Sequence, residues 1–174
     1  MKSLAAICAL VALTLLAGCG WHLRGYDSSG ALSEGSQARN AAMATLKHGG
    51  LHIVSENRYN AFYSALTLVL TKHNIKERGD SAIIVQLSPE RMERKPLAYG
   101  STGVPAQYEL TLSLNYQLSR NGETLFTQRQ LLSRRNYDFD PDLVVEKDRE
   151  REELLAEMRI ELSERMLSSI AKAL

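Results

Sequence analysis

One cysteine follows a short apolar run, in a pattern that supports a specific covalent modification. Lys2 precedes an apolar stretch from Leu4 to Leu16, and Ala17-Gly18-Cys19 closes it. A positive residue, a short apolar stretch and small residues before a cysteine are typical of a bacterial lipoprotein signal. The thiol of Cys19 would accept diacylglycerol, and the small residues before it would fit the signal peptidase. We therefore expect residues 1–18 to be removed and Cys19 to carry diacylglycerol and an N-acyl chain, with no cofactor besides this lipid.

The same apolar stretch could instead be a transmembrane anchor or a buried helix. It is about 13 residues long, whereas a helix needs about 20 residues to cross a bilayer. A cleaved signal is therefore the better interpretation. Gly20 follows the cysteine, where an aspartate would tend to retain a lipoprotein at the inner membrane. We expect a lipid anchor in the inner leaflet of the outer membrane, with the protein on the periplasmic side.

No set of side chains forms a recognisable catalytic or metal-binding motif. His48 and His52 are four residues apart, but the two glycines between them disfavour a helix that would place both rings on one face. Cys8 lies in the signal, so the expected mature chain has no free thiol and no disulfide. Glycine-rich phosphate loops and nucleophile elbows are also absent from the sequence. We expect neither an enzyme nor a metal protein.

Basic side chains are the remaining candidates for a binding role. They are Arg91, Arg94, Lys95, Arg134, Arg135 and Lys147. Lysine and arginine bind phosphate groups through charge-assisted hydrogen bonds. The alternative is an ordinary solvated surface, because acidic residues lie beside most of them. Without Lys2 the chain has 20 basic and 20 acidic side chains, and this balance argues against a nucleic-acid partner.

Apolar periodicity predicts the elements that must position these residues. A short strand is predicted at Leu51–Val54, and helical spacing predicts an amphipathic helix from Asn57 to His73 with Asn57 as its cap. The run Ala82–Leu87 predicts a strand that continues beyond Pro89 as an edge or bulged segment. Apolar and polar residues alternate from Tyr108 to Ser119, which predicts a long strand with one buried face.

The dipeptide Asn121-Gly122 predicts a tight hairpin between this strand and a second one from Glu123 to about Asp138. A two-residue turn would place Leu118 opposite Leu125. The same register would place Arg129 opposite Leu114 and Arg135 opposite Tyr108, on the buried face. We therefore expect either a bulge that resets the register or an end of the ribbon that leaves the core.

The remaining elements complete a fold prediction. Asp140-Pro141 predicts the start of a long C-terminal helix with exposed first turns, and the segment Asp27–Thr45 reads as an irregular tether. The predicted organisation is a signal peptide at 1–18, a lipidated tether at 19–45 and one domain at 46–174. The predicted fold is α+β, a two-layer sandwich in the order β-α-β-β-β-α. In it, a mixed sheet of about four strands carries two helices on one face.

Several of these residues resemble a known family. The run from Cys19 to Gly25, Cys-Gly-Trp-His-Leu-Arg-Gly, resembles the start of the mature lipopolysaccharide-assembly lipoprotein LptE. Further matches cover Gln107–Thr111, the hairpin, Arg134–Asp138 and the stretch from Leu143 to Met158. The resemblance therefore spans essentially the whole mature chain.

The resemblance implies a specific role. LptE lipoproteins plug the large β-barrel LptD, assist its assembly and help deliver lipopolysaccharide to the outer leaflet. They are also held to bind lipopolysaccharide through basic residues, and Lys147 matches one such position. A second basic position is expected in the loop before the long strand, where this chain has Tyr99–Thr102, so Arg94 or Lys95 is expected to take that role. The alternative is a lipoprotein that binds a lipid or small ligand without a barrel partner.

Overall fold

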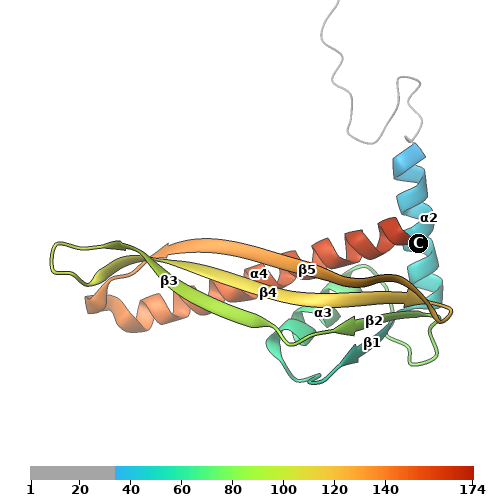
Figure 1. Cartoon of the computed structure of the whole chain (residues 1–174), viewed down its shortest axis with the longest axis horizontal. Helices are drawn as coiled ribbons and strands as arrows, with labels where there is room; N and C mark the ends of the chain where they lie inside the picture. Colours follow the sequence, from blue (N-terminus) through green and yellow to red (C-terminus); the bar gives the residue numbers. More distant parts are fainter. Residues whose placement is uncertain (1–33) are drawn as a thin grey trace, which may run out of the picture. The chain divides into compact units, whose positions relative to one another are not determined.

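A computed structural model describes residues 34–174. Cys19 and the expected signal lie outside these residues. By its internal contacts the chain divides after Ala38, and the larger compact unit is Arg39–Leu174. The elements are α2 (Glu34–Gly49), β1 (His52–Ser55), α3 (Ala61–Lys72), β2 (Ile83–Leu87), β3 (Arg91–Tyr99), β4 (Pro105–Arg120), β5 (Glu123–Asp138), the 3-10 turn η1 (Pro141–Leu143) and α4 (Val144–Ala173). The predicted α+β class is confirmed (Figure 1).

The sheet has five strands arranged around β4. β5 pairs along one edge of β4, while β2 and β3 pair in succession along its other edge. β1 joins the outside of β2 in parallel, and the other pairings are antiparallel. The mixed sheet is therefore four strands wide where β2 lies and three strands wide where β3 lies. The predicted edge strand beyond Pro89 is β3, which has register shifts after Pro96.

α3 and α4 pack on one face of the sheet and against each other (Figure 1). The even-numbered residues of β4 from Leu110 to Leu118 face this helix layer and are buried, as their alternation predicts. The core-facing stripe of α4 contributes Leu155, Met158, Leu162, Met166 and Ile170. The odd-numbered residues of β4 from Glu109 to Ser119 form a half-buried polar face that α3 and α4 leave open.

Two of the polar contacts that join α4 to the rest of the unit involve Glu90 and Glu164. Arg159 donates to both carboxylate oxygens of Glu90, at 2.9 to 3.3 Å, between β2 and β3. Glu164 accepts from Lys72 at 2.7 Å and lies 2.8 Å from the His73 ring, at the end of α3. These carboxylates hold α4 in register with the junction of β2 and β3 and with α3.

The N-terminal boundary differs from the prediction. An irregular tether was expected up to Thr45, but α2 already begins at Glu34. Ala42 and Leu46 of this helix are buried in the main core, so the compact unit begins near Arg39 and not at 46. The run Ala41-Ala42-Met43-Ala44 has high helix propensity, which the count of large apolar residues does not capture.

The predicted cap of α3 was also wrong. Asn60 caps the helix, because its side chain accepts a hydrogen bond from the Tyr63 amide at 2.7 Å. Asn57 instead accepts from the Tyr59 amide at 2.8 Å and forms a turn before the helix. At the other helix, Asp140 caps η1, as its position before Pro141 predicts, and α4 begins at Val144.

The β4–β5 hairpin has the predicted turn and a different register. Asn121 and Gly122 both have positive φ, at 52° and 82°, as the turn requires. Leu118 faces Phe126 and not Leu125, and Arg129 faces Tyr116 and not Leu114. Two bulges near Leu118 each add one residue to β5, so a bulge is present as predicted, but it does not move the arginines off the buried face.

The bulges shift the register by two residues in total, so Arg129 and Arg135 still lie on the helix-facing side. α4 supplies polar partners for both. Arg129 donates to Ser169 at 2.7 Å, and Arg135 donates to Glu161 at 2.6 Å. Arginine on this face is tolerated because β5 is an edge strand and the guanidinium groups reach the side of α4.

The outer edge of β5 carries two further arginine contacts. Arg165 donates to the backbone carbonyl of Leu132 at 2.7 Å, and Arg135 donates to the carbonyl of Arg134 at 3.0 Å. Asn115 of β4 directs its backbone groups away from β5, toward Ser88. By the alternation of an antiparallel ladder, Leu132 and Arg134 then direct theirs outward. Guanidinium groups therefore occupy two outward carbonyls of this edge.

Candidate functional site

The basic residues expected to bind lipopolysaccharide lie where the sheet is three strands wide. Arg94 and Lys95 are neighbours in β3, and Lys147 is in the first turn of α4. Arg94 pairs with Leu110 and therefore faces α4, whereas Lys95 pairs with Glu109 on the opposite face. The structure thus places Arg94 and Lys147 on one side of the sheet and Lys95 on the other.

Three aromatic rings form the centre of this region. Tyr108 and Tyr137 are cross-strand partners whose rings stack with centroids 5.8 Å apart. Phe139 meets Tyr108 edge-to-face at 5.5 Å. The guanidinium carbon of Arg94 lies 4.4 Å from the Tyr108 ring centroid, and its Nη1 lies 3.4 Å from the Tyr137 hydroxyl. A cation over an aromatic face is favourable, so the ring stack fixes the position of Arg94.

Lys147 and Arg151 continue the core-facing stripe of α4 beyond Leu155. Each lies one helical turn from the next, so apolar contacts give way to cations where the helix passes the aromatic rings. Their side chains are only 21% and 23% exposed. We call Arg94, Lys147 and Arg151, with Tyr108, Tyr137 and Phe139, the aromatic–basic cluster.

Carboxylates neutralise most of these cations. Lys147 donates to Glu150 at 2.8 Å, and this hydrogen bond raises the pKa of Lys147, with further contributions from Asp138 and Asp140. Arg151 donates to Asp148 at 2.7 Å and to Glu152 at 3.0 Å, and the Glu152 contact raises its pKa. Both side chains therefore stay charged at neutral pH. A phosphate group that binds to Lys147 or Arg151 therefore competes with these carboxylates.

Arg94 differs from the other two cations. Its contacts are the Tyr108 ring and the Tyr137 hydroxyl, and the part of the chain that the structure describes gives it no carboxylate within salt-bridge distance. Lys95, by contrast, lies 3.3 Å from Glu93. Of these two candidates, Arg94 is thus the one without a carboxylate partner among residues 34–174.

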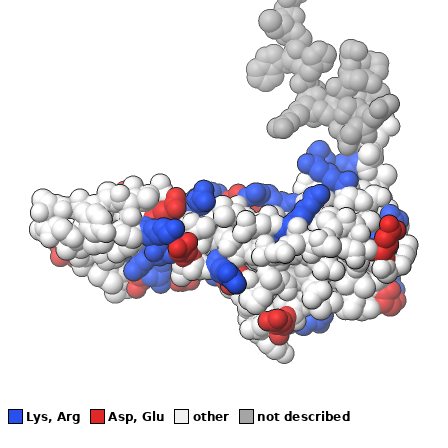
Figure 2. All heavy atoms as spheres, in the orientation of Figure 1, with Lys and Arg blue, Asp and Glu red and all other residues white. Residues whose placement is uncertain are grey.

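Exposed apolar side chains surround the same end of the sheet. Leu97, Tyr99 and Val104 are exposed near the β3–β4 turn, and Leu143, Val144 and Val145 are exposed where α4 begins. Val145 is the most exposed of these six residues, at 82%. Figure 2 shows few charged atoms at the end of the sheet where the β3–β4 turn lies, and a group of lysine and arginine side chains beside it. This end of the sheet is thus amphipathic: the exposed apolar residues form its tip, and charged side chains lie beside them.

Tyr108, Tyr137, Phe139 and Arg151 were not singled out from the sequence. Both tyrosines were assigned to strands, but their pairing depends on a register that the bulges reset. Arg151 lies within the charged run from Glu146 to Glu153, so it did not stand out among its neighbours. It could have been found from its position four residues before Leu155, which places it on the core-facing stripe of the helix.

Neither a metal cluster nor a membrane-spanning helix is found among residues 34–174. No three histidine, cysteine, aspartate or glutamate side chains in this range could hold a metal ion. Within the same range, no helix is long and apolar enough to cross a membrane.

Comparisons with known proteins agree on one family. The family model for LptE, described as lipopolysaccharide-assembly, matches residues 49–170. Among solved structures, rare lipoprotein B from Shewanella oneidensis is 28% identical, with a TM-score of 0.64 over 71% of this chain and 94% of that chain. A comparison with curated proteins finds no match.

Two further structures are similar in fold. A minor lipoprotein from Acinetobacter baumannii is 18% identical, with a TM-score of 0.58 over 71% of this chain and 91% of that one. An uncharacterized lipoprotein B from Nitrosomonas europaea is 19% identical, with a TM-score of 0.60 over 70% of this chain and 81% of that one. At this level of identity the likeness concerns the fold alone.

Proposed function

The chain belongs to the LptE family of non-catalytic lipopolysaccharide-assembly lipoproteins, and from this premise we propose its specific task. It plugs the lipopolysaccharide-translocating β-barrel LptD, assists the assembly of that barrel and helps to deliver lipopolysaccharide to the outer leaflet. Cys19 holds it by lipid in the inner leaflet of the outer membrane, on the periplasmic side.

The observation that carries the proposal is the family match, which extends over the aromatic–basic cluster. Residues 49–170 include Arg94, Tyr108, Tyr137, Lys147 and Arg151. The cluster combines cations that stay charged at neutral pH with an apolar tip beside them. This combination matches the chemistry of lipopolysaccharide, which carries phosphate groups next to acyl chains.

The open face of the sheet supports placement in a barrel. The lumen of an outer-membrane barrel is polar, so a plug needs a polar surface without a strong net charge. The odd-numbered side chains of β4 from Thr111 to Ser119 are all uncharged and polar. Such a face can contact polar lumen walls through hydrogen bonds and bridging water.

Co-purification tests the barrel partnership. Full-length protein with a C-terminal tag, extracted in mild detergent from its native envelope, is expected to bring down an outer-membrane barrel in a fixed ratio. A tagged Cys19→Ala protein that still carries the signal shows how much retention depends on the lipid. Loss of the barrel in both preparations would contradict the proposal.

Charge substitutions test lipopolysaccharide binding. Lys147→Glu places a carboxylate beside Glu150, Asp138 and Asp140, so we expect it to weaken lipopolysaccharide binding by tenfold or more, about 1.4 kcal/mol. Glu150→Gln frees the Lys147 ammonium and is expected to strengthen binding. Lys172→Glu is the matched control at an exposed position near the other end of α4. Equal losses for Lys147→Glu and Lys172→Glu would show only nonspecific electrostatics.

A further inference from the structure

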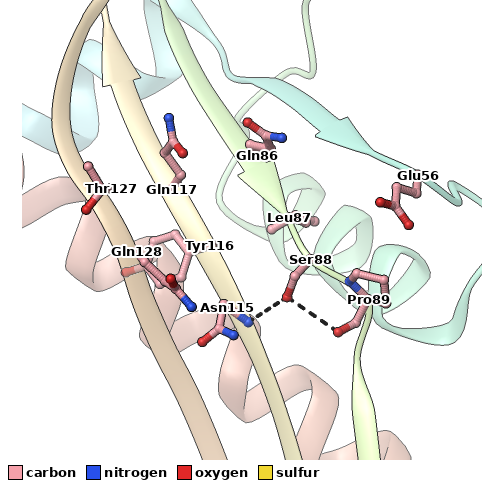
Figure 3. Close-up of a pocket in the computed structure, with 10 residues that line it drawn as sticks. All are labelled: Glu56, Gln86, Leu87, Ser88, Pro89, Asn115, Tyr116, Gln117, Thr127 and Gln128. Atoms are coloured by element: carbon pink, nitrogen blue, oxygen red, sulfur yellow. Dashed lines mark hydrogen bonds between the residues drawn. The ribbon is translucent and has the colours of Figure 1, made fainter.

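A concavity of about 270 Å³ lies mainly on the open face of the sheet, where β2 ends and the chain turns into β3. Its polar lining comes from Glu56, Gln86, Asn115, Gln117, Thr127 and Gln128. Figure 3 shows these side chains along β2, β4 and β5, with Glu56 just beyond the end of β1. This is just below the usual size of small-molecule sites, about 300–1,000 Å³, so the concavity suits a group no larger than a sugar ring.

A bulge in β5 supplies part of this lining. Between the pairs Leu118–Phe126 and Tyr116–Arg129, β4 contributes only Gln117, whereas β5 contributes both Thr127 and Gln128. The extra residue changes the direction of the strand and of its side chains. Gln86 is the partner of Gln117 across the β2–β4 ladder. The bulge beside Gln117 therefore gathers amide side chains at one place.

The floor of the concavity is fixed while its side chains are free. The Asn115 amide donates to the Ser88 hydroxyl at 2.8 Å, and the Ser88 amide donates to the Asn115 carbonyl at 2.9 Å. Within residues 34–174, the side-chain amides of Gln86, Gln117 and Gln128 make no hydrogen bond to another residue. These groups are available to a ligand without loss of an internal contact.

The lining selects a chemical class. No lysine, arginine or histidine lines the concavity and Glu56 is acidic, so a phosphate group is disfavoured. Each amide offers both a donor and an acceptor, and a carboxylate accepts from hydroxyl groups. Neighbouring hydroxyls of a sugar ring present the complementary donors and acceptors. We propose that this concavity binds a neutral saccharide unit.

An extended peptide fits less well. Peptides that add to a sheet pair with the backbone of an edge strand. Here the backbone amide and carbonyl of Asn115 are already bonded to Ser88, so β4 offers no free edge at this point. A ligand must approach the face of the sheet and contact side chains, as a sugar ring can.

The NMR signals of the side-chain amides give a direct test. The sample is the chain Arg39–Leu174, or a longer chain if only the longer one shows a cooperative unfolding transition. The probes are core oligosaccharide released from lipopolysaccharide and freed of lipid and phosphate, maltotriose, and chitotriose. We expect millimolar binding of at least one saccharide, seen as shifts of the Gln86, Gln117 and Gln128 amide signals in nitrogen–proton spectra. The relative response to the three probes separates a lipopolysaccharide source from other glycans.

Matched variants make the test specific. Gln86→Ala and Gln117→Ala are each expected to weaken saccharide binding about fivefold, the effect of one net hydrogen bond. Gln130→Ala is the control, because Gln130 lies opposite Asn115 but outside the concavity, and it should leave binding unchanged. The inference would be overturned by unchanged amide signals at 20 mM of every probe. An equal effect of Gln130→Ala, or stronger shifts with trialanine, would overturn it too.

The inference rests on the concavity and not on the barrel partnership. Saccharide binding is titrated on the chain without a barrel, so it is measured independently of co-purification. Failure of co-purification for the unmodified chain would contradict the proposed function and leave saccharide binding to be judged on its own titration.

Discussion

The contact between Arg159 and Glu90 should make a large contribution to stability for a single ion pair. Both side chains are mostly buried, at 14% and 18% exposure, and Arg159 makes three contacts of 2.9 to 3.3 Å with the two carboxylate oxygens. Removal of one partner from a fully buried pair costs about 3–5 kcal/mol, and exposed pairs contribute about 0–1 kcal/mol. The residual exposure places this pair between these limits.

We therefore expect Arg159→Met to lower the free energy of unfolding by about 2 kcal/mol. Methionine keeps much of the apolar stem of arginine, so the loss reports mainly the Glu90 carboxylate left without its cation. At about 4 °C per kcal/mol for a unit of this size, the melting temperature should fall by about 8 °C. Glu90→Gln should cost less, because an amide can still accept one hydrogen bond from the guanidinium.

A double-mutant cycle measured by urea unfolding checks this reasoning. The double variant Arg159→Met/Glu90→Gln should be no less stable than Arg159→Met, because a neutral amide tolerates the site better than an unpaired carboxylate. The coupling free energy should then exceed about 1 kcal/mol. Arg149→Met is the control, since Arg149 pairs with Glu153 in solvent at 82% and 63% exposure and should cost less than about 0.5 kcal/mol. Strict additivity in the cycle would refute the argument.

Three further predictions test the core, the hairpin turn and one carboxylate. Leu162→Ala removes a fully buried side chain of α4 and should cost about 2–5 kcal/mol in urea unfolding, whereas the exposed Glu157→Ala should change little. Gly122→Ala should lower the free energy of unfolding by about 1 kcal/mol, because Gly122 has a φ of +82°. Gly49→Ala is the control and should be neutral or stabilising, because Gly49 has an ordinary φ and open space around it. Equal effects of the two substitutions would contradict the turn geometry. Burial opposes ionisation of Glu164, but hydrogen bonds from Lys72 and His73 outweigh it and lower its pKa. The stabilising effect of the Glu164 carboxylate is therefore complete above its unfolded-state pKa of about 4.3, and it is lost as the pH falls through the folded-state pKa. Glu164→Gln should be less stable than the unmodified chain at pH 7 and equally stable near pH 2.

Strong periodicity made most of the fold predictable. Alternation in β4 and the Asn121-Gly122 turn fixed the central hairpin, since period two and positive φ have few other solutions. The parallel β1–β2 pair and the succession of β2 and β3 along one edge of β4 could not be deduced, because they depend on contacts between distant segments. α2 was missed because a helix with few large apolar residues resembles a linker in composition.

The candidate site was predictable only in part. Lys147 was one of six basic candidates and the family resemblance singled it out, but nothing in the sequence shows that Glu150 neutralises it. Arg94 and Lys95 were equal candidates until the register placed them on opposite faces. The conflict at Arg129 did predict a bulge, but the observed bulges leave Arg129 on the helix-facing side. The position of a bulge beside Gln117 requires coordinates, because a bulge can lie at any of several points along the ribbon.

The arginine contacts along the outer edge of β5 affect whether this edge can pair with a strand of another molecule. A bare edge of this length would accept a strand from a second copy, which is a common start of aggregation. Arg165 and Arg135 already occupy the carbonyls of Leu132 and Arg134, so an incoming strand would have to displace two charge-assisted hydrogen bonds. At these two positions the edge is thus disfavoured as a pairing site for a second copy of the chain.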